Sequence, residues 1–520
     1  MFWLTLFFAL FFSRNHPAWV AVFIILFDLY WLFKAVNGAL HLISAYRKYK
    51  YFITLDWLDL VGRLADFREY LIYLNEKLDN RTLRPLARDY YRQEIKRISA
   101  LANSGKASGN YRDYYHLVLY PFVDEGVEVL QTTVDALRAI NFPKDRIMIV
   151  LASEERAGEQ AKATAEKLQK MYEGEFFRFF VTVHPDGLPG EIKGKSANAS
   201  YAVQSLLPEI EKLGISVDQV LVSNFDSDTI VDRQYFSRLM YEFLTAEKPY
   251  RSSYQPIAVY NNNIWDSPSF VRVVSVSNTF WQFIESSRPD RLRTFSSHSM
   301  TLRALIEVGF WRKDLVNEDG YIFWQCYLHY EGDYRVIPLF VPVSLDTCLA
   351  ESYKKTLINQ YKQKRRWAYN VEYYPSLVPA IIKSKAPFWD KLYKLFMFVE
   401  GNYNWATASV VISALGWLPL FLGGSNFGQT VIAANLPFAT RILMTIATFF
   451  LIFSVYVNMY LLPPRPKKYS KWRVASMYAQ WVFVPFISII FGSLPAIEAQ
   501  TRLMFGRYME FWVTPKIRKE

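Results

Sequence analysis

Apolar residues are concentrated at the two ends of this 520-residue chain, whereas the middle has the composition of an ordinary globular protein. The stretches 18–46, 405–422, 438–462 and 474–494 approach or exceed the length that crosses a bilayer, which is about 20 apolar residues. A single soluble core does not segregate its apolar residues in this way. The chain is therefore expected to consist of a membrane part, a globular part and a second membrane part.

Four sections follow from this pattern. The apolar run 2–12 is only about half the length needed to span a bilayer; counted with the longer stretches, it brings the expected number of membrane segments to about five. A secretory signal peptide is the competing interpretation of the N-terminus, but the basic region that begins such peptides is missing. The expected sections are an N-terminal transmembrane helix or hairpin at 1–50, a cytosolic helical segment at 51–110, a globular domain at 111–383, and an interfacial helix, transmembrane helices and cytosolic loop at 384–520.

Basic residues predict the orientation of the chain. Clusters at 47–50 and 463–473 border apolar stretches and mark the cytosolic side. The last apolar stretch contains Pro485 and precedes further basic residues, including Lys516, Arg518 and Lys519, which predicts a broken or re-entrant passage that returns the C-terminus to the cytosol. The net charge of +12 lies beside apolar segments, which favours an anionic membrane face over nucleic acid. We expect a protein of the plasma (inner) membrane that contacts membrane lipids and no nucleic acid.

Three residues have unusual positions for their type. Asp28 lies within an apolar stretch, where it either faces a partner or a wet cavity, or reaches an interface because the helix is tilted; both interpretations remain open. Cys326 and Cys348 are too few for a disulfide framework and are expected to be buried or idle thiols.

The middle of the chain alternates between strands and helices. Buried-strand runs at 116–120, 146–151 and 220–225 are separated by helical patterns at 127–139 and 196–212. This alternation predicts an α/β fold with a parallel sheet that is covered on both faces. Ligands of such sheets bind beyond the carboxyl ends of the strands.

Two pairs of acidic residues are candidates for this ligand-binding edge of the sheet. Asp226 and Asp228 follow the third predicted strand on a turn, where two carboxylates can share a divalent cation that neutralises a diphosphate. The alternative is an ordinary polar turn. Glu318 and Asp319 precede an aromatic helix, where a carboxylate is commonly a helix cap but can also be a general base.

A basic and aromatic segment follows at 360–367. Arg366 offers a forked set of donors for phosphate, and Trp367 offers a flat face for a sugar ring. A basic helix beside a bilayer is the competing interpretation of this segment.

Together these motifs resemble those of the family 2 inverting glycosyltransferases with a GT-A fold. The membrane-bound branch that carries Gln-x-x-Arg-Trp includes cellulose, chitin and hyaluronan synthases and ceramide glucosyltransferase, and the resemblance covers 116–374. It implies a Rossmann-like, mostly parallel sheet in a cytosolic domain flanked by transmembrane and interfacial helices. Residues 511–516 are similar to the Phe-x-Val-Thr gating loop of cellulose synthases, which closes over the nucleotide.

The resemblance also implies roles for individual residues. Asp319, with Glu318 beside it, is the catalytic base; Asp226 and Asp228 hold Mg²⁺ or Mn²⁺; and Trp367 contacts the acceptor. The residues expected near the nucleotide are Pro121, Glu125, Glu154, Lys195, Asp226, Gln363, Arg366 and Thr514. The family usually has an aspartate pair after its second strand, where this chain has Glu154 and Glu155, so the nucleobase is left open although a UDP-sugar is the expected donor.

The expected function is transfer of a hexose from a nucleotide sugar, with inversion, to a hydroxyl of a growing polysaccharide or membrane-associated acceptor. One alternative is non-processive glycosylation of a lipid. Another is a catalytically silent scaffold or regulator that binds a nucleotide sugar. The identity of the sugar and the oligomeric state are left open.

Overall fold

The computed structural model describes residues 1–105 and 109–515. The loop expected at 103–110 therefore lies partly outside the described residues. The basic residues Lys516, Arg518 and Lys519 lie wholly outside them.

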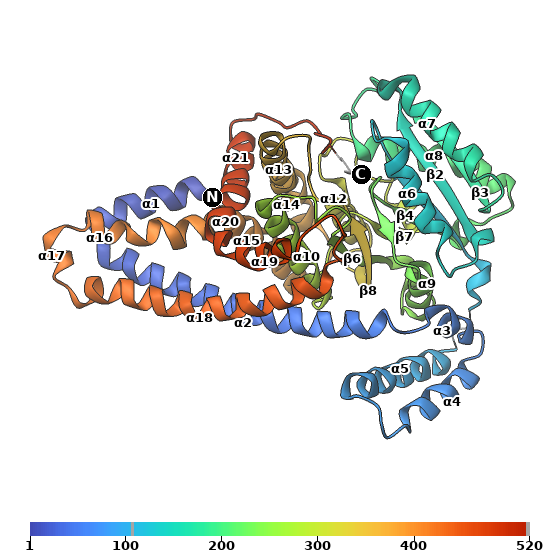
Figure 1. Ribbon diagram of the computed structural model, residues 1–520, viewed down its shortest axis with the longest axis horizontal. Helices are drawn as coiled ribbons and strands as arrows, with labels where there is room; N and C mark the ends of the chain where they lie inside the picture. Colours follow the sequence, from blue (N-terminus) through green and yellow to red (C-terminus); the bar gives the residue numbers. More distant parts are fainter. Residues whose placement is uncertain (106–108, 516–520) are drawn as a thin grey trace.

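Within the described residues, eight strands form one curled sheet in the order β3-β2-β1-β4-β7-β6-β8-β5 (Figure 1). Strands β1, β2, β3 and β4 are mutually parallel, β7 runs antiparallel to β4 and β6, and β8 is parallel to β6 but antiparallel to β5. The bounds are β1 Tyr115–Pro121, β2 Ile147–Glu154, β3 Arg178–His184, β4 Val220–Asn224, β5 Ile230–Val231, β6 Ser252–Tyr260, β7 His298–Thr301 and β8 Arg335–Leu345.

The predicted α/β fold class is confirmed, and the three strands predicted from the sequence correspond to β1, β2 and β4. The sheet is mixed, however, and its antiparallel half was not predicted. Prolines are one reason: β6 contains Pro256 at an irregularity in its pairing, and β8 contains Pro338 and Pro342. Prolines are tolerated here because β8 has only the two-residue β5 on its other side, so most of it is an edge strand.

Helices cover both faces of the parallel half (Figure 1). Side chains of β1 alternate between the two faces, with Val118 and Tyr120 in one core and Leu117 and Leu119 in the other. The first core is closed by α6 Val127–Arg138, α7 Gly158–Met171 and α9 Tyr235–Thr245, and the second by α8 Lys195–Lys212, α11 Leu302–Glu307 and α12 Glu318–His329. The further helices of this part are α10 Ser269–Ser286, α13 Tyr353–Ala368 and α14 Tyr374–Lys383.

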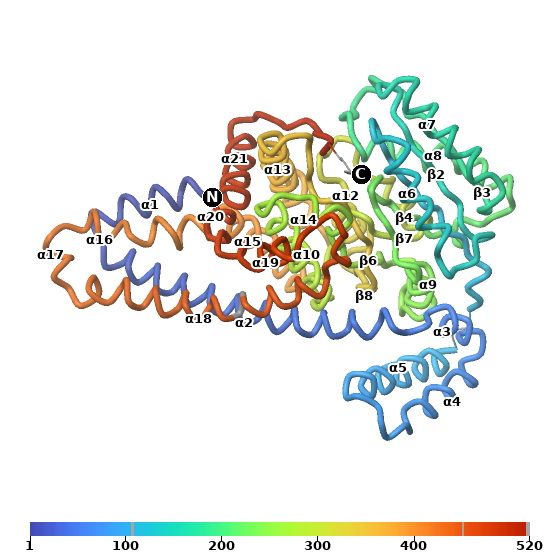
Figure 2. The backbone as a smooth tube through the Cα atoms, viewed as in Figure 1, coloured from blue at the N-terminus to red at the C-terminus, as the bar shows by residue number. Residues whose placement is uncertain are grey.

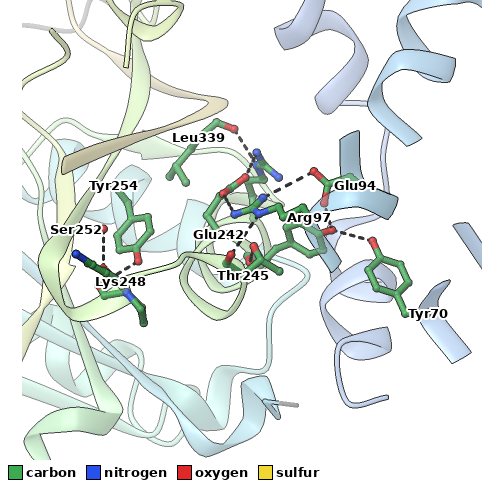
Figure 3. A network of polar contacts seen from close by, with 12 residues as sticks. Tyr70, Glu94, Arg97, Glu242, Thr245, Lys248, Ser252, Tyr254 and Leu339 are labelled. Atoms are coloured by element: carbon green, nitrogen blue, oxygen red, sulfur yellow. Dashed lines mark hydrogen bonds and ion pairs between the residues drawn. The ribbon is translucent and has the colours of Figure 1, made fainter. Parts of the chain in front are cut away.

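The helical hairpin expected after the first membrane segment is present as α3 Trp57–Arg63, α4 Phe67–Leu78 and α5 Pro85–Asn103, which project beside α9 (Figure 1). A buried polar network joins it to the sheet domain (Figure 3). Arg97 on α5 forms an ion pair of 2.6 Å with Glu242 on α9, and Tyr241 donates a hydrogen bond of 2.5 Å to Glu94. Burial favours a raised pKa for Glu242, but Arg238 and Arg97 together hold that pKa below its usual value.

The apolar helices extend away from the sheet as an elongated bundle (Figure 2). In the described part of the chain, three helical stretches are long and apolar enough to cross a membrane: Pro17–Phe52, Val431–Leu461 and Lys471–Met504. Phe388–Ser413 and Leu415–Leu422 could form a fourth span across a bend of 49°. The elements are α1 Phe2–Asn15, α2 Pro17–Phe52, α15 Phe388–Ser413, α16 Leu418–Leu422, α17 Gly424–Gly428, α18 Val431–Leu461, α19 Lys471–Ala479, α20 Val484–Ser488 and α21 Leu494–Met504.

The expected count of about five membrane segments was too high, because α1 has only 14 residues and the stretch 405–422 is not a separate straight helix. Helix α15 runs without a break through both the expected interfacial helix and the first half of that stretch. The last apolar stretch is irregular as expected, with 3₁₀ turns before α20 and a π-helical turn before α21.

Two sequence expectations about isolated residues can be answered. Asp28 is buried and faces a partner, because Thr440 on α18 donates a hydrogen bond of 2.7 Å to its carboxylate. Cys326 and Cys348 are both buried free thiols.

Candidate active site

A cavity of about 550 Å³ lies at the carboxyl ends of β1, β4, β6 and β8 and continues to the membrane-side helices α2 and α15. Every site residue predicted from the sequence lines it. These residues are Pro121, Glu125, Glu154, Lys195, Asp226, Asp228, Glu318, Asp319, Gln363, Arg366, Trp367 and Thr514. Residues that are up to about 390 positions apart in the chain therefore meet at one edge of the sheet, as the strand-end rule requires.

The turn after β4 carries the two aspartates expected to hold a metal. Asp226 forms an ion pair of 2.6 Å with Lys195 and accepts a hydrogen bond of 2.5 Å from the hydroxyl of Ser296. Asp228 is buried and accepts a hydrogen bond of 2.8 Å from the backbone N–H of Asp346. The turn is thus connected to β7 through Ser296 and to β8 through Asp346.

Lys195 is the first residue of α8 and points its ammonium group into the acidic end of the cavity. Burial alone would lower the pKa of Lys195, but the carboxylates of Asp226, Glu318 and Asp319 raise it above its usual value. The lysine is therefore charged at neutral pH and partly compensates these three acidic groups.

The acidic pair opens α12, as the sequence indicated. Burial raises the pKa of Glu318, and repulsion by the carboxylate of Asp319 raises it further. Burial also raises the pKa of Asp319, although the positive charge of Lys195 opposes this shift. The segment before the pair is fixed by Glu372, whose carboxylate accepts hydrogen bonds of 3.0 Å from the N–H groups of Val316 and Asn317.

Helix α13 presents the basic and aromatic residues. The guanidinium of Arg366 lies 4.7 Å over the ring of Phe511, and the backbone carbonyl of Arg366 accepts a hydrogen bond from Asn317. Trp367 packs at 6.1 Å from the ring of Tyr260. Gln363 lines the cavity and accepts a hydrogen bond of 3.0 Å from Gln360.

Phe511, Val513 and Thr514 of the C-terminal segment line one end of the cavity, beside Arg366. Gly194 leaves room for this segment, since a Cβ there would lie 2.8 Å from the ring of Phe511. Two polar atoms at this end, Nε of Arg366 and the hydroxyl of Thr514, are buried without a hydrogen-bond partner among the described residues. Unpartnered buried donors of this kind are uncommon and are typical of sites that bind a ligand.

The remaining predicted acidic residues have protein partners. Glu125 accepts hydrogen bonds from the hydroxyl of Ser227 and from a backbone N–H in its own loop. Glu154 faces the cavity and forms an ion pair of 2.6 Å with Arg156, whereas Glu155 accepts a hydrogen bond from the backbone of Asp186. Of the two glutamates after β2, Glu154 is thus the one placed beside the cavity.

Sequence reasoning missed several residues of the site, namely Tyr260, Arg293, Ser296, Asp346 and Glu372. Asp346 comes directly after β8, just as Asp226 comes two residues after β4. The strand-end rule would therefore have identified Asp346 if the proline-containing strand β8 had been predicted. Ser296 and Arg293 belong to the loop before β7, and no pattern in the sequence marks that loop.

The donor set fits a divalent cation only with help from a substrate. Among the described residues, no group of three or more His, Cys, Asp or Glu side chains is arranged to hold a metal. Mg²⁺ is usually bound through one or two carboxylates together with substrate phosphates and water, and Asp226 and Asp228 match that requirement. A cation would have to share Asp226 with Lys195.

Residues 221–465 match the family model described as Glycosyl transferase family group 2. No curated protein sequence matches the chain. Among solved structures, the mannosyltransferase PcManGT from Pyrobaculum calidifontis, in complex with GDP-Man and Mn²⁺, has 13% identity and a TM-score of 0.40 over 76% of this chain and 89% of that chain. TarS residues 1–349 from S. aureus, in complex with UDP-GlcNAc, have 11% identity and a TM-score of 0.36 over 76% and 93%.

The matched region begins inside β4 and contains the aspartate turn, the acidic pair and Arg366 with Trp367. The family match therefore includes most of the charged residues that line the cavity, and it supports a family 2 glycosyltransferase.

Proposed function

We propose that the protein is a membrane-integrated, inverting glycosyltransferase that transfers a hexose from a nucleotide sugar to a hydroxyl of a growing polysaccharide or membrane-associated acceptor. The observation that carries this proposal is the single cavity in which Asp226, Asp228 and Asp319 meet Lys195 and Arg366. Such a cavity can hold a sugar diphosphate at one end and a proton acceptor beside the sugar.

In the proposed reaction Asp319 accepts the proton of the acceptor hydroxyl as the hydroxyl attacks the anomeric carbon. The raised pKa of Asp319 suits this role, because a base is most effective when its pKa approaches the working pH. Attack from the face opposite the leaving diphosphate inverts the configuration. Arg366 and Lys195 donate hydrogen bonds to the diphosphate, and Trp367 stacks on the acceptor sugar.

A divalent cation, when bound, would neutralise charge that develops on the departing diphosphate. Asp226 and Asp228 would hold it. The nearby hydroxyl of Ser296 and backbone N–H of Asp346 keep the two carboxylates in position.

Membrane integration is supported by the exposed apolar faces of the long helices. Trp19 and Phe33 on α2 and Phe449 on α18 are each more than 60% exposed, and a bilayer would cover them. The basic residues at the end of α2 and before α19 favour a cytosolic position for the catalytic part, where nucleotide sugars are available. We propose that the protein lies in the plasma (inner) membrane, with membrane parts at 1–50 and 384–520 and cytosolic parts at 51–110 and 111–383.

The test is release of nucleoside diphosphate from a panel of nucleotide sugars by the purified full-length protein, with UDP-sugars first. Asp319→Asn should reduce turnover about 10²–10⁴-fold, the usual contribution of a general base, with little change in donor binding. The matched control is Asp314→Asn, which alters a carboxylate on the same segment that pairs with Arg312 at the surface. Full activity of Asp319→Asn would remove that residue from the mechanism.

Mass analysis of the product separates the remaining functions. A ladder of lengths identifies a polymer synthase, and a single-sugar lipid product identifies the non-processive alternative. A chain that binds nucleotide sugars but releases no diphosphate with any donor would be a silent scaffold, and the enzymatic proposal would be wrong.

A further inference from the structure

The cavity has opposite charges at its two ends. At the sheet end the acidic groups outnumber the basic ones, with Asp226, Asp228, Asp346, Glu318 and Asp319 facing the cavity. At the other end, where the loop before β7 meets α15 and α2, the lining charges are Lys34, Arg291, Arg293, Glu285 and Glu400. A substrate that fills the cavity is therefore presented with cations where the membrane-side helices begin.

Two of these three cations are paired. Arg291 forms an ion pair with Glu285, with nitrogen–oxygen distances of 2.9 and 3.0 Å. Lys34 on α2 forms an ion pair with Glu400 on α15. Arg293 is the exception, because no carboxylate or carbonyl in the described part of the chain hydrogen-bonds its guanidinium.

Arg293 is nevertheless held firmly in place. Its guanidinium lies 5.4 Å from the ring centre of Phe398 and 5.7 Å from that of Trp324. Desolvation lowers its pKa, yet an arginine remains charged at neutral pH. The nearby charge of Glu285 supports the guanidinium, and its donors face the cavity and are not buried without a partner, so they are available to a ligand.

The position of Arg293 relates it to the acceptor. The ring of Phe398 stacks at 5.9 Å on Tyr373, and the hydroxyl of Tyr373 donates a hydrogen bond to the carbonyl of Asn317, next to the acidic pair. Arg293 and Asp319 both act electrostatically on Tyr373, so an acceptor hydroxyl beside Asp319 and a charged group beside Arg293 would occupy neighbouring parts of one cavity. Helix α15, which carries Phe398, begins ten residues earlier with the exposed aromatic residues Phe388 and Trp389.

We propose that Arg293 binds an anionic group, phosphate or carboxylate, on the acceptor. This inference rests on the proposed function and adds the substrate class: an acidic acceptor. An anion of this type has two sources, the phosphate of a lipid headgroup or the carboxylate of an acidic sugar. Arg293 can bind either through two parallel N–H donors.

The experiment uses the full-length protein in nanodiscs of zwitterionic lipid and two pairs of probes. One pair is dodecyl phosphate and its dimethyl ester, and the other is methyl β-D-glucuronide and its methyl ester. Within each pair esterification removes the negative charge and adds only methyl groups. Binding is measured by titration for the wild type, Arg293→Met, Arg293→Lys and the control Lys385→Met, which removes an exposed cation that pairs with Glu331 and does not line the cavities beside Arg293.

The wild type should bind the anionic member of one pair about tenfold more tightly or better than its ester. That preference should vanish in Arg293→Met, survive in part in Arg293→Lys and be intact in Lys385→Met. A preference for dodecyl phosphate assigns the anion to a lipid, and one for the glucuronide assigns it to a sugar. Absence of any preference in the wild type, or its persistence in Arg293→Met, would overturn the proposal.

Two further readings keep this test separate from that of the proposed function. Weakened binding of a nucleoside diphosphate in Arg293→Met, with the anionic probes unaffected, would assign Arg293 to the donor and contradict the inference. Failure of the wild type to release diphosphate from any nucleotide sugar would contradict the proposed function, whatever the probes show, because probe binding does not require turnover.

Discussion

The ammonium group of Lys195 lies 2.6 Å from the carboxylate of Asp226. The residue expected to contact the nucleotide therefore holds one of the residues expected to hold the cation. Before a divalent cation binds, the ammonium group of Lys195 can neutralise the carboxylate of Asp226, because the lysine and the cation are both positively charged. Once a diphosphate is present, the same ammonium can donate to phosphate oxygens.

Replacing Lys195 by Met should affect cation binding and donor binding in opposite directions. Without nucleotide, Mn²⁺ should bind the variant several-fold more tightly, because a competing positive charge has been removed from Asp226. Binding of a nucleoside diphosphate should weaken by about tenfold, since one charge-assisted hydrogen bond is lost. Titration of Mn²⁺ by electron paramagnetic resonance and calorimetry of the diphosphate measure the two effects.

The control for this prediction is Lys193→Met, two residues earlier, where the lysine pairs with the surface residue Asp186. Its Mn²⁺ affinity should equal that of the wild type. Equal Mn²⁺ affinity of Lys195→Met and the wild type would show that Lys195 does not compete for the cation.

Glu372 predicts a pH dependence of stability. Burial raises the pKa of Glu372 from 4.5 to about 7, although the N–H groups of Val316 and Asn317 oppose the shift. Between these values the folded protein keeps a proton that the unfolded chain releases, so this residue's contribution to stability falls as the pH rises from about 4.5 to about 7. The loss is at most about 3 kcal/mol.

Glu372→Gln should remove this part of the pH dependence. The midpoint of thermal unfolding, followed by fluorescence at pH 5 and pH 8, should differ less in the variant than in the wild type. Glu351→Gln, an exposed carboxylate that pairs with Lys355, serves as the control. An unchanged difference between the two pH values in Glu372→Gln would mean that Glu372 is already charged in the folded protein at pH 5.

The sequence predicted three of the four parallel strands, β1, β2 and β4, because a run of buried residues is a local pattern, but it missed β3. A run of buried residues predicts a strand, and the carboxyl ends of parallel strands necessarily share an edge. The resemblance to known glycosyltransferase motifs, which occur in the same order along the chain, indicated that Asp226, Asp319 and Arg366 belong to one site. The strand-end rule placed only Asp226 at the sheet edge, and the resemblance predicted that Asp319 and Arg366 meet it there.

The remaining site residues depend on long-range packing. Glu372 reaches Val316 and Asn317 only because α14 and the segment before it fold back across α12, and glutamate at that position has no local signature. Ser296 and Arg293 lie in an irregular loop that leads into the antiparallel strand β7. The proline content of β8 concealed Asp346, since prolines argue against a central strand although not against an edge.

The network between α5 and α9 predicts that the helical hairpin is part of the folded core (Figure 3). Arg97→Met would leave Glu94 and Glu242 close together with only Arg238 to compensate them, and removing one partner of a buried pair costs about 3–5 kcal/mol. The thermal midpoint should therefore fall by several degrees, whereas Arg92→Met, an exposed position on the same helix, should leave it unchanged. An unaltered midpoint in Arg97→Met would show that the hairpin is only loosely attached.

Gly194 and Phe511 provide a direct test of the C-terminal segment. The backbone of Gly194 is extended, with φ of 171°, so alanine there meets no conformational strain. Its Cβ would nevertheless lie 2.8 Å from the ring of Phe511. Gly194→Ala should therefore push Phe511 away from Arg366 and raise KM for the nucleotide sugar several-fold, with a smaller effect on kcat.

A double-mutant cycle decides whether this effect arises from the collision itself. Phe511→Ala alone removes the ring that stacks on Arg366 and should also raise KM. If the collision is the cause, adding Gly194→Ala to Phe511→Ala should have no further effect, because the space is then empty. Additive increases in KM would instead mean that Gly194 acts through the start of α8 and Lys195, and that Phe511 does not press on this turn in the working enzyme.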